Sequence, residues 1–269
     1  MRIAVDHHTR YRFSTPQDRI VQMLRLTPGD TRCQTVVNWM VSVDCDARLR
    51  DAVDGFGNPV TMLYADGPID AIDVHVTGEV LTTDADGVIH GSAEPLPRLV
   101  YLRTTPRTTP GDGLPGFAAE SVSGARDRLD ALHRLNRALH ARFPCAPDAA
   151  DTGASAADAF QRGSATSRDV AQMFIAAARG MDIPARYVSG YRSDSVAQSA
   201  PHAWAEAHVD ELGWVGFDPA AGVSPDDHYV RVAIGLDAAG AAAIAGTRIG
   251  HGLEQLDVDL HVERLNGDA

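Results

Sequence analysis

The sequence of 269 residues is short of cysteine, of basic side chains and of long apolar runs, and each shortage bears on the class of protein. Its cysteines, Cys33, Cys45 and Cys145, are odd in number and lack the spacing of metal ligands. Lys and Arg number 24 against 36 Asp and Glu, and this formal net charge of −12 argues against nucleic-acid or anionic-membrane partners. No segment approaches the roughly 20 apolar residues of a membrane-spanning helix.

The N-terminus and the histidines add two further expectations. The first eight residues carry a charge inside their only apolar run and no small-residue cleavage site, so we do not expect a signal peptide. With so few cysteines, a reducing cytoplasm is the simplest location. His7, His8, His251 and His261 show no ligand spacing, so we expect neither a metal ion nor another cofactor. The oligomeric state does not follow from the sequence.

A helix is predicted to begin at Ser167. Serine is a favoured N-cap residue, and the carboxylate of Asp169 suits the positive end of the helix dipole. Gly180 and Pro184 are expected to end the helix. Its apolar face recurs at helical spacing and consists of Val170, Met173, Phe174, Ala177 and Ala178.

Three strands are predicted after this helix, at residues 185–192, 202–209 and 214–218. A hairpin turn centred near residue 211 would place Asp218 across from about residue 204, and cross-strand neighbours lie roughly 5–8 Å apart. His202 and Asp218 can therefore meet, with the carboxylate orienting the imidazole. Ser167 stands at a helix N-terminus, where the charge of a nucleophile would be stabilised. The pattern is that of a catalytic triad.

At these residues the chain resembles the bacterial transglutaminase-like family, which belongs to the papain-like superfamily and includes proteins described as cysteine proteases. The matching segments are IPARYVSGY at 183–191, HAW at 202–204 and GWVGFDP at 213–219. The resemblance implies that His202 is the base and Asp218 the orienting acid. It also implies acyl transfer on a peptide or glutamine amide in a peptide or protein substrate, with an oxyanion hole that includes the N–H of residue 167.

The chain departs from the family pattern at the nucleophile. The family has Gly-x-Cys-x-Asp, whereas residues 165–169 here place Ser167 in the position of the cysteine. A serine hydroxyl is far less acidic than a thiol and has to lose its proton during attack, so we expect Ser167 to be a weak nucleophile or none. Three interpretations stay open: a natural inactive member that binds peptides, an experimental Cys→Ser replacement, and a working Ser-His-Asp amidohydrolase.

The predicted fold is α+β, with an N-terminal antiparallel β-sandwich and a papain-like, transglutaminase-like core in which a helix packs on an antiparallel sheet. Short alternating strands with turns between them indicate the sandwich at residues 1–100. The region also resembles the N-terminal part of family members, through LRLTP at 24–28 and DGFGN at 54–58. Residues 101–125 are predicted as a linker and 126–269 as the core, with residues 256–263 forming an edge strand of the C-terminal sheet.

Several residues near the predicted triad have secondary roles. Trp204, Tyr187 and Tyr191 are candidate walls of a substrate cleft, although packing alone also explains them. Glu206 shares a strand face with His202 and is the reserve for the orienting acid. Cys145 is a remote candidate for a relocated nucleophile, because it precedes the loop and does not start the helix.

Overall fold

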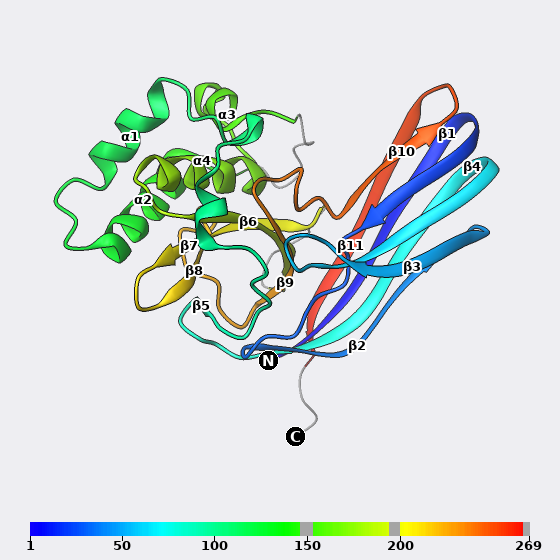
Figure 1. The fold of residues 1–269 in the computed structure, drawn as a ribbon, viewed down its shortest axis with the longest axis horizontal. Helices are drawn as coiled ribbons and strands as arrows, with labels where there is room; N and C mark the ends of the chain where they lie inside the picture. Colours follow the sequence, from blue (N-terminus) through cyan, green and yellow to red (C-terminus); the bar gives the residue numbers. More distant parts are fainter. Residues whose placement is uncertain (146–152, 194–199, 266–269) are drawn as a thin grey trace.

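A computed structural model of the protein describes residues 1–145, 153–193 and 200–265. It contains two mostly antiparallel sheets, and Figure 1 shows the helices gathered on the sheet that carries β6 to β9. The predicted α+β class is confirmed, with an N-terminal antiparallel β-sandwich joined to a core in which helices pack on an antiparallel sheet. Within the described residues no helix has the length and apolar character to cross a membrane.

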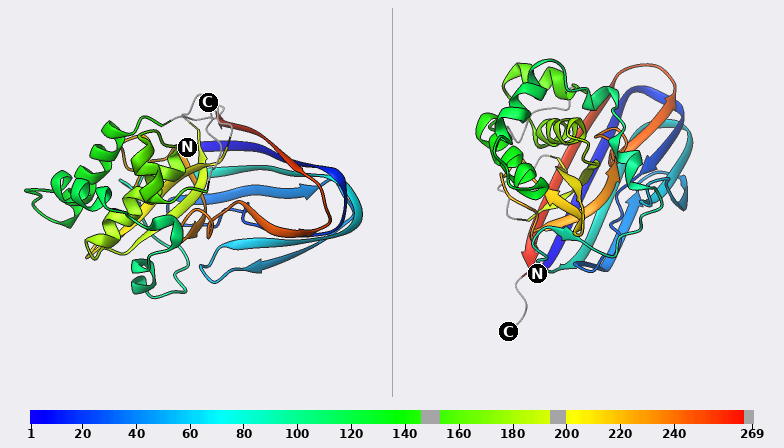
Figure 2. Two further views of the ribbon diagram at one scale, coloured as in Figure 1. Left: turned by 90° about the horizontal axis from the view of Figure 1, so that it is seen from above. Right: turned by 60° about the vertical axis from the view of Figure 1, so that its left-hand side comes forward.

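The N-terminal sheet is built on two long strands, β1 (Arg2–Leu24) and β4 (Pro59–Thr82), which pair along their whole length. The register shifts between Arg12 and Arg19, where the pair bends over itself (Figure 2). The first half of β1 and the second half of β4 are flanked by β11 (Glu254–Leu265) and β2 (Gln34–Val43). The other halves are flanked by β10 (Ile244–Ile249) and β3 (Ala47–Val53). One continuous sheet therefore supplies both layers of the sandwich.

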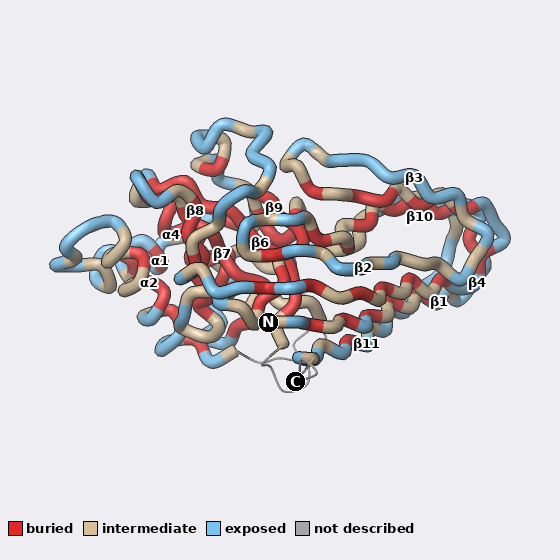
Figure 3. Tube along the Cα trace, turned by 90° about the horizontal axis from the view of Figure 1, so that it is seen from below, coloured by how far each residue is buried: buried red, intermediate tan, exposed pale blue. Residues whose placement is uncertain are grey.

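Side-chain alternation along the first half of β1 gives this layer of the sandwich an inner and an outer face. Ile3, Val5 and His7 point inward and are buried, whereas Asp6 and His8 belong to the more exposed outer face, as successive strand residues must. Figure 3 shows this alternation as buried and less buried stretches along the strand. An apolar cluster joins the two layers and includes Ile20, Leu24, Leu63, Ile72, Val74 and Val76.

The second sheet has the order β5-β8-β7-β6-β9. Its strands are β5 (Val88–Ile89), β6 (Ala185–Arg192), β7 (His202–Val209), β8 (Gly213–Phe217) and β9 (Tyr229–Gly235). Four α-helices cover one face: α1 (Gly113–Ser121), α2 (Arg128–Arg142), α3 (Ala156–Arg162) and α4 (Ser167–Gly180). Two 3-10 helices, Arg98–Leu102 and Pro106–Thr108, precede them.

Helix α4 is the most buried of these helices, because alanines on both sides let it approach the sheet closely. Its apolar face meets Ala203, Ala205 and Ala207, which form one face of β7. Trp204 and Glu206 alternate with them and lie on the opposite face of the sheet. The alternation predicted for residues 202–209 thus separates a helix-packing face from a polar and aromatic face.

The C-terminal strand was predicted to lie at the edge of the second sheet, and this prediction was wrong. Residues 256–263 do form part of an edge strand, β11, but it pairs with β1 in the N-terminal sheet. Alternation predicts a strand and its buried face, and it carries no information about which strand lies beside it. Helix α1 lies inside the segment predicted as a linker, where its Gly and Pro content favoured a loop.

The turn at residues 54–58 ties the two sheets together. Asp54 accepts hydrogen bonds from the N–H groups of Phe56 and Asn58 and from the side chains of Arg25 and Asn58. Burial alone would raise the pKa of Asp54, but these bonds lower it below its usual value. The amide of Asn58 in turn donates to the carbonyl of Ile234 and accepts from its N–H, both at 2.8 Å.

Replacing Asn58 with Ala should lower the free energy of unfolding by about 2–3 kcal/mol, because it leaves the buried N–H and C=O of Ile234 without their partner. Urea denaturation measures this change. Asn38→Ala, on an exposed position of β2, is the matched control and should stay within about 0.5 kcal/mol of the parent. Equal effects of the two substitutions would show that the turn does not join the sheets.

Candidate active site

His202 and Asp218 are in contact, as the hairpin register predicts. Ala205 pairs with Phe217, so the residues at the start of β7 and just beyond the end of β8 face each other. His202 Nε2 lies 2.7 Å from Asp218 Oδ2. The carboxylate is fully buried, whereas 13% of the imidazole side chain is exposed. The pair therefore combines a shielded acid with a ring that solvent or a ligand can reach.

Asp218 is held as an ionised carboxylate by four donors. Its Oδ2 also accepts from the hydroxyl of Tyr229 at 2.7 Å, and its Oδ1 accepts from the N–H groups of Ala220 and Ala221 at 2.9 and 3.3 Å. Burial acts to raise the pKa of Asp218, but His202 and Tyr229 together bring it below its usual value. Because this carboxylate only accepts, Nε2 of His202 carries the proton and the lone pair of a neutral ring lies on Nδ1.

Tyr229 is a site residue that the sequence did not indicate. It stands at the first position of β9, which pairs with β6 and not with β7 or β8. Its ring packs edge-on against Trp204, with centroids 5.4 Å apart, and also against His202 at 6.0 Å. No sequence signal separates it from an ordinary strand tyrosine, because its hydroxyl reaches Asp218 only through the order of the strands.

The N-cap of helix α4 is one residue earlier than predicted. Thr166 is the N-cap: its hydroxyl accepts from the N–H of Asp169 at 3.2 Å, and Asp169 Oδ2 accepts from the N–H of Thr166 at 3.0 Å. This reciprocal arrangement is a capping box, strengthened by Arg162 on the same carboxylate at 3.2 Å. Ser167 is consequently the first helical residue, partly exposed, and the cap does not depend on its hydroxyl.

A cavity of about 240 Å³ adjoins the starts of both α4 and β7. Arg168 and Pro201, the neighbours of Ser167 and His202, both line it. Much of the remaining wall is apolar and comes from residues 241–244 and from β11. The cavity therefore lies between the core and the N-terminal sheet.

Cys145 lies near the start of α4. It forms a parallel bridge with Ala165, two residues before Ser167, and the charges of Asp218 and Asp169 both act on its thiol. Burial is the largest influence and, with these two carboxylates, raises the pKa of Cys145 to about 12. A thiol that stays protonated at neutral pH is a poor nucleophile. Its bridge to Ala165 places Cys145 beside the start of α4.

Glu206 is occupied by arginines and is not a reserve acid for His202. Its oxygens accept from Nε of Arg186 at 2.6 Å and from Nε of Arg231 at 2.7 Å. Burial opposes ionisation, but the two guanidinium groups lower the pKa of Glu206 to about 2. Arg186 also binds Glu94 through two nitrogens and lies 3.9 Å from the ring centre of Trp214. This buried network holds β6, β7 and β9 together.

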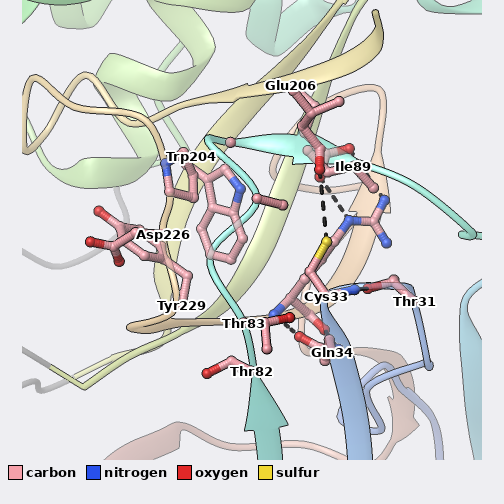
Figure 4. Close-up of a pocket in the computed structure, with 15 residues that line it drawn as sticks. Thr31, Cys33, Gln34, Thr82, Thr83, Ile89, Trp204, Glu206, Asp226 and Tyr229 are labelled. Atoms are coloured by element: carbon pink, nitrogen blue, oxygen red, sulfur yellow. Dashed lines mark hydrogen bonds and ion pairs between the residues drawn. The ribbon is translucent and has the colours of Figure 1, made fainter. Parts of the chain in front are cut away.

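The three aromatic residues predicted for a cleft are all buried. Tyr187 lines the cavity beside Arg168 and Pro201. Trp204 lines a second cavity, of about 70 Å³, on the face of the sheet opposite α4, together with Glu206, Tyr229 and Cys33 (Figure 4). Tyr191 lies 3.0 Å from Nδ1 of His7 at the junction of the two sheets. Substrate contact stays a prediction for all three residues, and Tyr187 is the one best placed for it.

The family comparisons agree with this architecture. Residues 115–219 match the model of the transglutaminase-like superfamily core, and residues 3–81 match that of the bacterial transglutaminase-like N-terminal region. Together the two models cover most of the chain, which therefore belongs to the transglutaminase-like superfamily.

Relatives and solved structures extend the similarity over the whole length. An uncharacterized protein of Mycobacterium leprae is 25% identical across 98% of this chain and 99% of its own. One of Mycobacterium tuberculosis is 24% identical across 100% and 94%. The crystal structure of "a Putative Cysteine Protease from Cytophaga hutchinsonii" superposes with a TM-score of 0.79 at 18% identity, covering 100% of this chain and 92% of that one. This last similarity shows the fold.

Replacing Glu206 with Gln should destabilise the protein by about 3–5 kcal/mol, because it removes the charge that Arg186 and Arg231 share inside the sheet. Glu120→Gln, on the exposed side of α1, is the matched control and should change the free energy of unfolding by less than about 0.5 kcal/mol. Chemical denaturation of the two variants gives both values. A Glu206→Gln variant as stable as the parent would rule out a structural role for the network.

Proposed function

We propose that the chain is an acyl-transfer protein of the transglutaminase and cysteine-protease type, acting on peptide or glutamine amides through Ser167, His202 and Asp218. The observation that carries the proposal is the 2.7 Å contact between His202 Nε2 and the buried carboxylate of Asp218. It directs the lone pair of the ring to Nδ1, which makes this nitrogen the proton acceptor.

In the proposed reaction the side chain of residue 167 attacks the amide carbonyl, and its proton passes to Nδ1 of His202. The carbonyl oxygen becomes an oxyanion, which the backbone N–H of residue 167 stabilises together with the dipole of α4. The C–N bond then breaks, and His202 donates the proton to the departing amine. Water or a second amine resolves the acyl intermediate, giving hydrolysis or transamidation.

Serine at position 167 makes this cycle slow. A thiol beside a histidine and a helix N-terminus has a pKa lowered to about 3.5–7.5, so it attacks as a preformed thiolate. A hydroxyl has no such charge, and its proton has to move during the attack. In this proposal the chain has the residues of an acyl-transfer site in place, and serine at position 167 lowers its turnover.

The alternative function is peptide binding without turnover. The feature that favours it is the serine itself, beside a cavity of about 240 Å³ with a largely apolar wall. A second alternative, a working Ser-His-Asp amidohydrolase, requires the ring of His202 to accept the proton of Ser167 directly.

Ser167→Cys is the decisive variant. Its new thiol should react with iodoacetamide at pH 6 at least tenfold faster than the thiol of Ser164→Cys, an exposed position just before the helix, because thiolate forms only at the former. Adding His202→Ala to Ser167→Cys should remove the difference. Mass mapping separates these sites from Cys33, Cys45 and Cys145.

The three candidate functions predict different results when the parent chain and Ser167→Cys are compared. Labelling of Ser167 by a fluorophosphonate would establish a serine amidohydrolase. Peptide amide turnover that is slow in the parent chain and much faster in Ser167→Cys supports the proposed acyl-transfer site, and peptide binding without turnover in either chain supports the binding module. Equal alkylation rates at positions 167 and 164 would refute the proposed site.

A further inference from the structure

A group of charged and imidazole side chains lies on the outer face of the N-terminal sheet. On β1 this face is opposite to the one whose residues His7, Thr9 and Tyr11 line the cavity of about 240 Å³. His8 on β1 and His75 on β4 are directly opposed in the antiparallel register. Asp6 lies two residues before His8 and so shares its face of β1. This Asp-x-His pair on one strand and a single His on its neighbour bring three side chains together from residues that are 69 positions apart.

The possible ligand atoms of these residues lie close together. Asp6 Oδ1 lies 3.5 Å from Nε2 of His8 and 3.2 Å from Nε2 of His75. A tetrahedral zinc ion with bonds of about 2.0–2.1 Å separates its ligand atoms by roughly 3.3 Å, and the two spacings from Asp6 to the histidines are close to this value. All three residues offer an atom within 4.8 Å of the other two.

A further carboxylate orients the first imidazole. Asp73 Oδ1 lies 3.2 Å from Nδ1 of His8, so the proton of a neutral ring is on Nδ1. The lone pair of the ring is then on Nε2, the nitrogen on the side of Asp6, where it can bind a metal ion. Arg10 holds the other oxygen of Asp73 at 3.1 Å. Histidine ligands of metal ions almost always have such a partner on their second nitrogen.

The surroundings add negative charge on the same face. The register places Asp259 of β11 opposite His8 and Asp257 opposite Arg10. In a chain with a formal net charge of −12, this face attracts cations and repels anions.

We propose that Asp6, His8 and His75 bind a divalent transition-metal ion of the zinc class, with a fourth position open to water. Two imidazoles and one carboxylate suit Zn²⁺ and Co²⁺ and do not suit Mg²⁺ or Ca²⁺, which prefer oxygen ligands alone. The side chain of Asp6 is 53% exposed and those of His8 and His75 are 26% and 31% exposed, so an ion can enter from solvent. The site is separate from the proposed acyl-transfer function.

Coordination requires a small change in the two rings. They stack with centroids 3.7 Å apart and an interplanar angle of 16°, whereas a bound ion has to lie close to the plane of each ring. Rotation about the Cβ–Cγ bonds supplies this tilt, and that torsion has a broad energy minimum. The backbone positions, fixed by the β1–β4 pairing, do not have to move.

Asp226, Asp227 and His228 form a second cluster of possible ligands. They are consecutive, and the imidazole Nδ1 of His228 lies beside both carboxylates at 3.1 and 3.5 Å. A single imidazole with two carboxylates from one chain segment makes a weaker site for this class of ion than two imidazoles held by paired strands.

The test uses the full chain without a polyhistidine tag, freed of metal with EDTA and titrated with Co²⁺ and then Zn²⁺. Four-coordinate Co²⁺ gives an intense visible absorption, and we expect it to appear in the parent and to vanish on addition of Zn²⁺. His75→Gln should weaken Zn²⁺ binding in calorimetry at least tenfold, and Asp73→Asn should weaken it about 10–100-fold through the orientation of His8. His251→Gln, in an exposed loop, is the matched control and should bind like the parent.

Circular dichroism without metal checks that each variant is folded, and Asp6→Asn, at an exposed position, serves if His75→Gln is not. Loss of one bound ion per chain in the ligand variants, with the control unchanged, supports the site. Absence of the cobalt absorption, or equal Zn²⁺ affinity and stoichiometry in His75→Gln and His251→Gln, would overturn it.

Discussion

The ionised carboxylate of Asp218 is the charge on which the candidate site depends. It is fully buried and would be costly there without partners, yet it receives hydrogen bonds from His202, Tyr229 and two backbone N–H groups. Each partner comes from a different part of the second sheet or the turn beyond it. The site is therefore assembled only when β7, β8 and β9 take their places together.

A second buried charge network supports the same strands from the other direction. Glu206 binds Arg186 and Arg231, and Arg186 extends the network to Glu94. These residues lie on the face of the sheet opposite α4, so the helix and the ion pairs fix β7 from its two sides. The strand that carries His202 is thus packed on both faces, which suits a base that has to keep one orientation.

The N-terminal sheet packs against the core although the two are separate in most of the sequence. It receives β10 and β11, so along the sequence the segment that forms the core is inserted between strands of one sheet. Its inner face joins the core through His7 and Tyr191, while its outer face presents Asp6, His8 and His75 to solvent. One strand thus has a structural face and a face free for binding.

The sequence by itself determined the elements and the central contact. Periodicity gave β6 and β7 with their observed bounds, and hairpin geometry brought His202 to Asp218, because both depend on residues close along the chain. Only the tertiary structure decided that β11 joins β1, that Tyr229 reaches Asp218, and that His8 meets His75. Those contacts depend on strand order, and side-chain alternation is the same whichever strand lies alongside.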